Sequence, residues 1–462
     1  MKNLFLIAAS SFCLSVAALA SPATELFDQG VNFMTLNYHG YSTVNPAELG
    51  AKLRAELESV CAGSPTCAAS TATSFLQRLT SEMNDGHTYY LNPNSYQQFK
   101  LAFSGASTNP NPSYGFTMGG ANSRGEVMIE DVVADSPAFL GGLRPFDRVL
   151  RVNGTRLVRP SAASGVRTGA PSDASSRFRE LLQTDAVVTL SVMRGDAKKP
   201  RFGTVRMQRQ KLAKTNLPFL YQPATAPKGI LVMRFPTFVG SNDIAPRAHA
   251  LVAEAQAQGA TGIVLDLRGN GGGEETECYG ASSAFIGRAV NINETVTQKV
   301  LVGFDGGKFI GNDPQDPVKF EISKPALWKG NVAVLVDSGT ASCGELTAYF
   351  MQLKKRGSVI GEQTYGVLDT ATEFWKLLDG SALAITYVRT QNEDGSRVPE
   401  FVTPDQTVPY QPDVIAETGR DPMLEAAIAS FAPKVAGAKT SLLAMLDPLI
   451  GWNRTQVPHS IK

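Results

Sequence analysis

The chain has 462 residues, a hydrophobic content of 43% and a formal net charge of +1. This length allows about three domains with sizeable cores. The balanced charge argues against a nucleic-acid partner, which would need a basic surface, and against an acidic disordered chain.

Residues 1–20 have the pattern of a secretory signal. Lys2 gives the N-terminal region a positive charge, residues 4–17 are mostly apolar, and Ala18-Leu19-Ala20 forms an A-x-A cleavage site. An uncleaved anchor is the alternative, but the run is short for a bilayer span. No other stretch of the sequence is long and apolar enough to cross a membrane. We therefore expect a periplasmic or extracellular protein with no membrane span after cleavage.

Signal cleavage would leave four cysteines, which are Cys61, Cys67, Cys278 and Cys343. An even number in an exported chain permits disulfides, and four cysteines allow three pairings. Cys61 and Cys67 flank a Gly-Ser-Pro turn that suits a short-loop disulfide. No spacing typical of zinc ligands is present, so we expect neither a metal nor a cofactor.

Residues 21–105 are predicted to form an N-terminal helical domain. Apolar residues recur at helical spacing over residues 25–33, 46–61 and 70–83. The last of these segments ends in Asn84-Asp85-Gly86-His87-Thr88, which is a turn signal. Gly, Asn, Ser and Pro then become frequent over residues 104–113, which indicates a linker.

Residues 106–212 change to strand-like runs separated by turns. The expected strands cover residues 127–133, 148–152, 186–193 and 204–208. Residues 161–176 are rich in small and polar side chains and are predicted to be an inserted loop.

The turns of this β region carry specific residues in a fixed order. Tyr114-Gly115-Phe116-Thr117 is followed by Asp135-Ser136-Pro137-Ala138 and then by Asn153-Gly154. This order resembles a PDZ domain of the bacterial protease-associated type. The resemblance implies that a peptide adds as an extra strand and that the loop of Tyr114, Gly115, Phe116 and Thr117 holds its C-terminal carboxylate. A β domain without a ligand is the alternative.

Residues 213–432 alternate strand and helix, which predicts an α/β core. Strands are expected over residues 229–235, 262–267, 332–336 and 358–361, with a helix over 244–258. Residues 374–378 and 382–388 flank Asp379-Gly380 and predict a hairpin, and a last helix covers 424–431. The tail, 433–462, has no informative pattern. The fold class is therefore multidomain α/β (α+β), with an inserted β domain and an N-terminal helical domain.

One segment of this core has the arrangement that activates a serine. The apolar strand Val332–Val336 leads into a glycine-containing turn, Ser342 and an apolar-periodic helix. Such a turn lifts the hydroxyl clear of the sheet, where backbone N–H groups can hold an oxyanion. Ser342-Cys343-Gly344-Glu345 also fits an S-x-x-E capping box, and on local pattern alone the cap is the commoner role.

A second glycine-rich segment follows the strand over residues 262–267. Arg268-Gly269-Asn270-Gly271-Gly272-Gly273 has no lysine at the P-loop position, and Glu274 stands where a dinucleotide site needs a small residue. Nucleotide binding is therefore not expected. Glycines after a strand also suit an oxyanion hole, because a substrate can approach their N–H groups without interference from a Cβ atom.

The order of these pieces resembles the C-terminal processing (tail-specific) serine peptidase family, which includes the tricorn core. The resemblance spans residues 30–430 and implies a serine endopeptidase acting on polypeptides. It implies Ser342 as nucleophile, an oxyanion hole from the N–H groups of Gly272 and Cys343, and loops close enough for a Cys278–Cys343 disulfide.

The base differs between two branches of that family. The Ser/Lys branch has a lysine where this chain has Val367, and Lys376 comes nine residues later on a predicted strand. The tricorn-like branch uses Ser with His, and His87 matches its histidine. Imidazole, with an unperturbed pKa near 6.5, suits a group that accepts and then returns a proton. Glu400 matches the third, orienting carboxylate; Glu345 is a rival whose presence the capping box also explains.

Two other functions stay open from the sequence. The missing lysine would fit a catalytically inactive, PDZ-containing peptide-binding protein, and some relatives of this fold bind small hydrophobic ligands. We expect an exported serine endopeptidase whose PDZ-like domain controls access to the active site.

Overall fold

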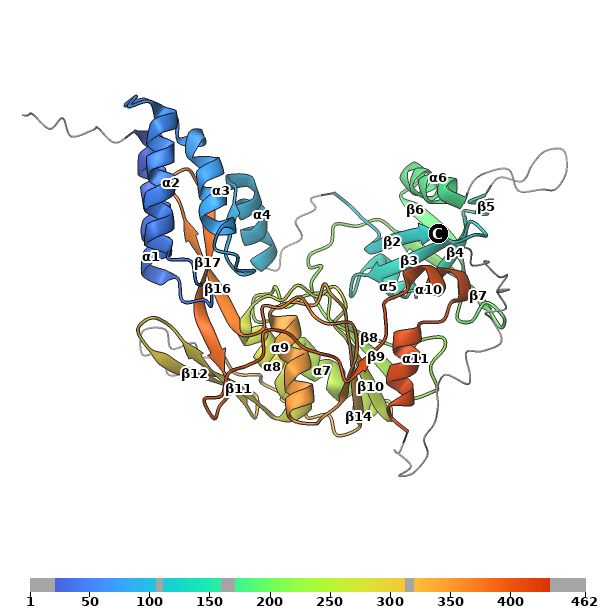
Figure 1. Ribbon diagram of the computed structural model, residues 1–462. Coiled ribbons are helices and arrows are strands. Elements are labelled where there is room, and N and C mark those ends of the chain that lie inside the picture. Colours follow the sequence, from blue (N-terminus) through green and yellow to red (C-terminus); the bar gives the residue numbers. More distant parts are fainter. Residues whose placement is uncertain (1–20, 105–110, 159–170, 312–319, 433–462) are drawn as a thin grey trace, which may run out of the picture.

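The computed structural model describes residues 21–104, 111–158, 171–311 and 320–432. The expected signal peptide, the C-terminal tail and residues 161–170 of the expected loop lie outside the described residues. Figure 1 shows three parts: N-terminal helices beside long strands, a central α/β layer, and a small β domain on the opposite side. The chain is thus a multidomain α/β protein.

The central sheet has the strand order β18-β15-β14-β10-β9-β8. Its strands are β8 (Phe219–Tyr221), β9 (Ile230–Arg234), β10 (Gly262–Asp266), β14 (Asn331–Val336), β15 (Ser358–Gly361) and β18 (Gln406–Thr407). All neighbours pair in parallel except β8, which is antiparallel to β9. Every residue of β10 is buried, as expected for a parallel strand covered on both faces.

Two different cores cover the faces of this sheet. Ile263 and Leu265 pack with α7 (Ile244–Ala257), α8 (Glu275–Ile286) and α9 (Cys343–Leu353). Val264 faces the other side, toward α11 (Pro422–Ala429) and the small β domain. α10 (Pro412–Thr418) lies between these last two parts (Figure 1).

A second sheet joins distant parts of the chain in the order β1-β17-β11-β12-β13, with β16 also paired to β17. Its strands are β1 (Tyr89–Leu91), β11 (Arg288–Glu294), β12 (Lys299–Asp305), β13 (Lys308–Gly311), β16 (Thr370–Lys376) and β17 (Ala382–Gln391). β16 and β17 form the expected hairpin.

The N-terminal helices pack against this second sheet. They are α1 (Pro22–Asn37), α2 (Pro46–Cys61), the 3-10 helix η1 (Ala69–Ala72), α3 (Thr73–Ser81) and α4 (Pro93–Phe103). Leu383 and Ile385 of β17 belong to the same hydrophobic core as Leu26, Leu53 and Leu76. The helical part therefore completes its core with residues that lie more than 300 positions later in the sequence.

The small β domain is an antiparallel sheet in the order β2-β3-β4-β6-β7. It contains β2 (Phe116–Ala121), β3 (Val127–Val132), β4 (Arg148–Val152), β5 (Thr155–Arg156), β6 (Val187–Arg194), β7 (Arg201–Gln208) and the helices α5 (Pro137–Leu140) and α6 (Pro171–Thr184). The prediction of a loop through residue 176 was wrong for residues 171–176. They begin α6, because Ala174 and Phe178 are buried one turn apart against the sheet.

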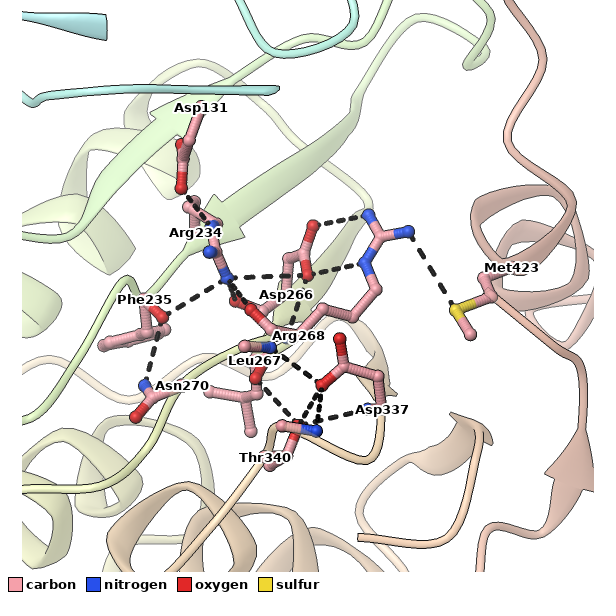
Figure 2. A network of polar contacts seen from close by, with 12 residues as sticks. Asp131, Arg234, Phe235, Asp266, Leu267, Arg268, Asn270, Asp337, Thr340 and Met423 are labelled. Atoms are coloured by element: carbon pink, nitrogen blue, oxygen red, sulfur yellow. Dashed lines mark hydrogen bonds and ion pairs between the residues drawn. The ribbon is translucent and has the colours of Figure 1, made fainter. Parts of the chain in front are cut away.

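A network of buried charges joins the central sheet to both of its neighbours (Figure 2). Arg268 pairs with Asp266 at 2.6 Å and with Asp421, at the start of α11, at 2.8 Å. Its guanidinium also lies 5.5 Å from the ring centre of Phe146 and 5.2 Å from that of Tyr410. Arg234 of β9 pairs with Asp131 of β3 at 2.9 Å. The carboxyl end of the sheet is thus fixed to the small β domain and to α11.

Replacing Arg268 with Met should lower the free energy of unfolding by about 3–5 kcal/mol, because Asp421 would stay buried without its charged partner. Arg420→Met is the matched control, since the Arg420–Glu425 pair is largely exposed and such pairs contribute about 0–1 kcal/mol. Urea unfolding of both variants measures the difference. Equal losses in the two variants would contradict a stabilising role of this network.

Candidate active site

Ser342 lies at a sharp turn between the end of β14 and the start of α9. Its φ is 51° and its ψ is −118°, a strained conformation for a residue with a side chain. Ser342 and Glu345 are arranged as a capping box, but only the carboxylate half is a clear hydrogen bond, from the Ser342 N–H to Glu345 Oε2 at 2.8 Å. The hydroxyl makes no cap hydrogen bond. The turn therefore places Ser342 at the N-terminus of α9 in a capping-box arrangement, without a side-chain cap hydrogen bond from its hydroxyl.

Hydrogen bonds tie the Ser342 turn to the glycine-rich loop after β10. Asp337 Oδ1 accepts from the Gly269 N–H at 2.8 Å, and the Thr340 hydroxyl donates to the Leu267 carbonyl at 2.9 Å. The Ala341 N–H donates to the Asn270 carbonyl at 2.9 Å. Figure 2 shows part of this junction beneath the Arg268 network. The two loops thus form one rigid unit.

Gly272 lies directly against Ser342. A Cβ atom at Gly272 would come within 2.7 Å of Ser342 Cβ, and the φ of Gly272 is 96°, so glycine is required on both counts. Its N–H donates to Asn270 Oδ1 at 2.9 Å. Of the two oxyanion donors expected from the sequence, the Gly272 N–H is therefore engaged in this conformation. Cys343 is the first residue of α9, where an N–H has no partner within the helix.

His87 lies on the loop between α3 and β1. The pairing of β1 with β17 fixes the position of the end of this loop. The His87 N–H donates to Asp85 Oδ1 at 2.9 Å. The same carboxylate accepts from the Tyr38 hydroxyl at 2.8 Å and from the Thr386 hydroxyl at 2.7 Å. Nδ1 of the imidazole is 2.9 Å from Thr370 Oγ1.

The imidazole of His87 is neutral over most of the pH range. His87 is 7% exposed. Burial lowers the pKa of its imidazole to about 4, and the negative charge of Asp85 partly opposes this shift. The expectation of an ionisation near 6.5 therefore needs correction, because nothing in the sequence reveals how deeply the ring is buried.

Ser342 and His87 line the same cavity, which has a volume of about 750 Å³. Aromatic side chains from β1, α4 and β16 form one wall, including Tyr89, Tyr96, Phe99, Phe103 and Phe374. Glu274 and Glu373 also line it, and burial together with the charge of Glu373 raises the pKa of Glu274 to about 7. The cavity is thus large enough for several side chains and is partly aromatic and partly acidic.

The two candidates for the third position have different surroundings. Glu400 is exposed, and the hydrogen-bond partner of the imidazole is Thr370. Glu345 is fully buried, and its carboxylate accepts from the Thr364 hydroxyl at 2.6 Å and from the Val367 N–H at 3.0 Å. Glu345 thus fixes the Ser342 turn to the segment that follows β15. Sequence reasoning missed Thr370, because no motif marks it.

Lys376 ends β16 with an exposed side chain, and Val367, at the position of the branch lysine, is 4% exposed. The described residues contain two disulfides, Cys61–Cys67, which the turn between them suggested, and Cys278–Cys343, which the resemblance implied. The second one links the first turn of α8 to the residue after Ser342.

The loop expected to hold a peptide carboxylate leads into β2. The Tyr114 hydroxyl donates to the Asp185 carbonyl at 2.6 Å, and Gly115 has a φ of 82°. The ring of Phe116 stacks on Phe178 of α6 with centroids 6.0 Å apart, and Thr117 lies within β2. The loop thus reaches the space between β2 and α6.

Within the described part of the chain, no helix is long and apolar enough to span a membrane. The same residues contain no group of three or more His, Cys, Asp or Glu side chains arranged to hold a metal ion.

Residues 229–408 match the model of peptidase family S41. A Staphylococcus aureus (strain COL) protein named probable CtpA-like serine protease is 26% identical over 336 residues, which are 71% of this chain and 58% of that protein. The chloroplastic C-terminal processing peptidase of Tetradesmus obliquus is 26% identical over 355 residues, which are 74% of this chain and 68% of that protein. The chain thus spans 58% of the length of its Staphylococcus aureus relatives.

Among solved structures, a putative S41 protease from Bacteroides fragilis is 17% identical, with a TM-score of 0.47 over 77% of this chain and 88% of that chain. The family match rests on sequence and includes the glycine-rich loop, Ser342 and Glu400, whereas His87 lies before the matched segment. The chain is thus similar in sequence to proteins named as serine peptidases.

The burial of His87 predicts a specific loss of stability in acid. The unfolded histidine binds a proton below about pH 6.5, whereas the folded one resists protonation down to about pH 4. Stability should therefore decline as the pH falls from 6.5 toward 4, and His87 should account for about 2–3 kcal/mol of this decline. Urea unfolding at pH 7 and pH 4.5 should show a smaller decline in the free energy of unfolding for His87→Gln than for the wild type. The same decline in both proteins would contradict the burial of a neutral ring.

Proposed function

We propose that this chain is an exported serine endopeptidase that cleaves polypeptides through an acyl-enzyme, with Ser342 as nucleophile and His87 as base. The observation that carries this proposal is the common cavity, which is lined by a serine on a strained turn and by a buried neutral imidazole. Since the segment carrying Ser342 matches peptidase family S41, peptide hydrolysis is the reaction that this serine would serve.

The proposed mechanism follows from the chemistry of the two side chains. His87 accepts the Ser342 proton as Oγ attacks the scissile carbonyl, and it then gives that proton to the leaving amine. Water later hydrolyses the acyl-enzyme. The Cys343 N–H, at the positive end of the α9 dipole, supports the oxyanion. Gly272 could supply a second donor once its N–H leaves Asn270.

The proposed histidine base would correspond to the Ser/His branch of the C-terminal processing peptidases. The lysine of the Ser/Lys branch is replaced by Val367, whose N–H is hydrogen-bonded to Glu345. A buried imidazole with a low pKa is a weak base, but it is unprotonated at every pH above about 4. We therefore expect the rate to rise with pH in the acid range instead of near 6.5.

The PDZ-like part, residues 106–212, is proposed to recognise the C-terminal end of the polypeptide substrate. Its β3 is joined to the core through the Asp131–Arg234 pair, beside the start of the glycine-rich loop. This contact gives the β domain a route by which it could control the active site. Export is supported by the signal pattern of residues 1–20 and by two disulfides, which persist in oxidising compartments.

The alternative function is a catalytically inactive peptide-binding protein. The engaged Gly272 N–H favours it, because an oxyanion hole with one donor fewer supports less catalysis. The strained turn at Ser342 argues against it, because an unused serine has no need of such a conformation.

A fluorophosphonate probe and peptide turnover separate the two functions. Wild-type protein should be labelled at Ser342, and Ser342→Ala or His87→Ala should each lower turnover by several orders of magnitude, about 10³–10⁶-fold. The double variant should be little worse than either single one, because the pair acts as a unit. Lys376→Ala is the control and should leave turnover unchanged. No labelling of the wild type, or labelling that persists in Ser342→Ala, would show that the serine is not a nucleophile.

A further inference from the structure

The imidazole of His87 makes a side-chain hydrogen bond with a hydroxyl group. Thr370 Oγ1 is 2.9 Å from Nδ1, and both residues line the cavity that contains Ser342. The two residues are 283 positions apart in the sequence, so only the pairing of β1 and β16 with β17 brings them together.

Thr370 is held firmly at the start of β16. It pairs with Arg389 of β17. The neighbouring Asp369 accepts a hydrogen bond from the Thr390 N–H at 2.8 Å through its carbonyl, and its buried carboxylate pairs with Arg397 at 2.7 Å. The hydroxyl is therefore presented by a rigid strand.

The nearby carboxylates are occupied by other donors. Asp85 binds the backbone N–H of His87 and the hydroxyls of Tyr38 and Thr386. Glu345 binds the N–H of Ser342 and the segment around Val367. Asp85 is the charged group whose field acts on the imidazole, and the charged side chains of the cavity wall are Lys100, Glu274, Glu275 and Glu373.

A base must present the correct ring nitrogen. If Nδ1 carries the hydrogen and donates it to Thr370 Oγ1, Nε2 keeps its lone pair and can accept the serine proton. The other tautomer has a hydrogen on Nε2 and cannot act as the base. A hydroxyl at Nδ1 orients the ring in either case, and it favours the competent tautomer when it accepts the hydrogen of Nδ1. In the catalytic triad a carboxylate, which can only accept, has this task.

We propose that Thr370 is the positioning residue that holds His87 in the competent tautomer, so that the catalytic unit is Ser342–His87–Thr370 and contains no orienting carboxylate. This inference rests on the proposed function, because it concerns the base of the same reaction. A neutral hydroxyl fixes the ring without adding a negative charge next to it, so it stabilises the imidazolium less than a carboxylate does.

The experiment compares Thr370→Val, which removes the hydroxyl at nearly constant volume, with Thr370→Ser, which keeps it. Thr370→Val should lower kcat by about 10–100-fold, which is the effect of losing one buried hydrogen bond, with little change in KM. Thr370→Ser should retain kcat within about threefold. Thr204→Val, on the exposed face of β7, and Glu400→Gln should both behave like the wild type.

Nitrogen NMR of the imidazole gives a readout that does not depend on turnover. In the wild type and in Ser342→Ala, His87 Nε2 should be unprotonated at pH 7, and Thr370→Val should show both tautomers. The nitrogen signals of His87 are assigned by their absence from the spectrum of His87→Gln.

Three outcomes would overturn the proposal: wild-type turnover in Thr370→Val, equal losses in Thr370→Val and Thr370→Ser, or a hydrogen on Nε2 in the wild type. If Glu400→Gln lost activity like Thr370→Val, a carboxylate would share the task and the unit as proposed would be wrong. If instead the wild type showed neither turnover nor probe labelling, the proposed function would fail, whereas the NMR tautomer would still decide the role of Thr370.

Discussion

The parallel pairing of β10 with β14 is the constraint on which the candidate site depends. Because the register aligns Asp266 with Leu335, both strands end at the same edge of the sheet, and their loops emerge side by side. Asp337 and the Asn270 carbonyl then join the two loops. Residue 272 can lie against Ser342 only as glycine, because this junction leaves no room for a side chain.

Much of the central layer could be predicted from the sequence, because its strands are continuous apolar runs and its turns carry glycine. β10, β14 and β15 lie within a residue of their expected bounds. α8 was not predicted, and its burial gives the reason: it is buried on nearly all sides, including polar residues such as Glu277 and Ser282, so it shows no amphipathic period. α4 was not predicted either, and the reason is the opposite one: none of its residues is fully buried.

The sequence indicates the candidate residues of the site, but it does not indicate the surroundings that the fold gives them. Ser342 and the glycines follow strands, so local pattern indicates them, and the order of motifs along the chain indicates His87. The partner of its imidazole depends on pairing across three strands, which no local pattern encodes. Burial of the ring depends on the same packing, so only the unperturbed pKa of a histidine follows from the sequence, whereas the folded chain lowers that pKa.

The shared core of the N-terminal helices and β17 has a consequence for the order of folding. The core that contains Leu26 and Leu53 also contains Leu383 and Ile385, so the first hundred residues can complete this core only after β17 has been made. Contacts between residues so far apart in the sequence form slowly, because the chain loses the entropy of closing a long loop before the contacts stabilise it. The serine turn is built from nearer segments, whereas the histidine reaches its place only with the hairpin. The two halves of the site therefore mature at different times, and a partly synthesised chain has no complete site.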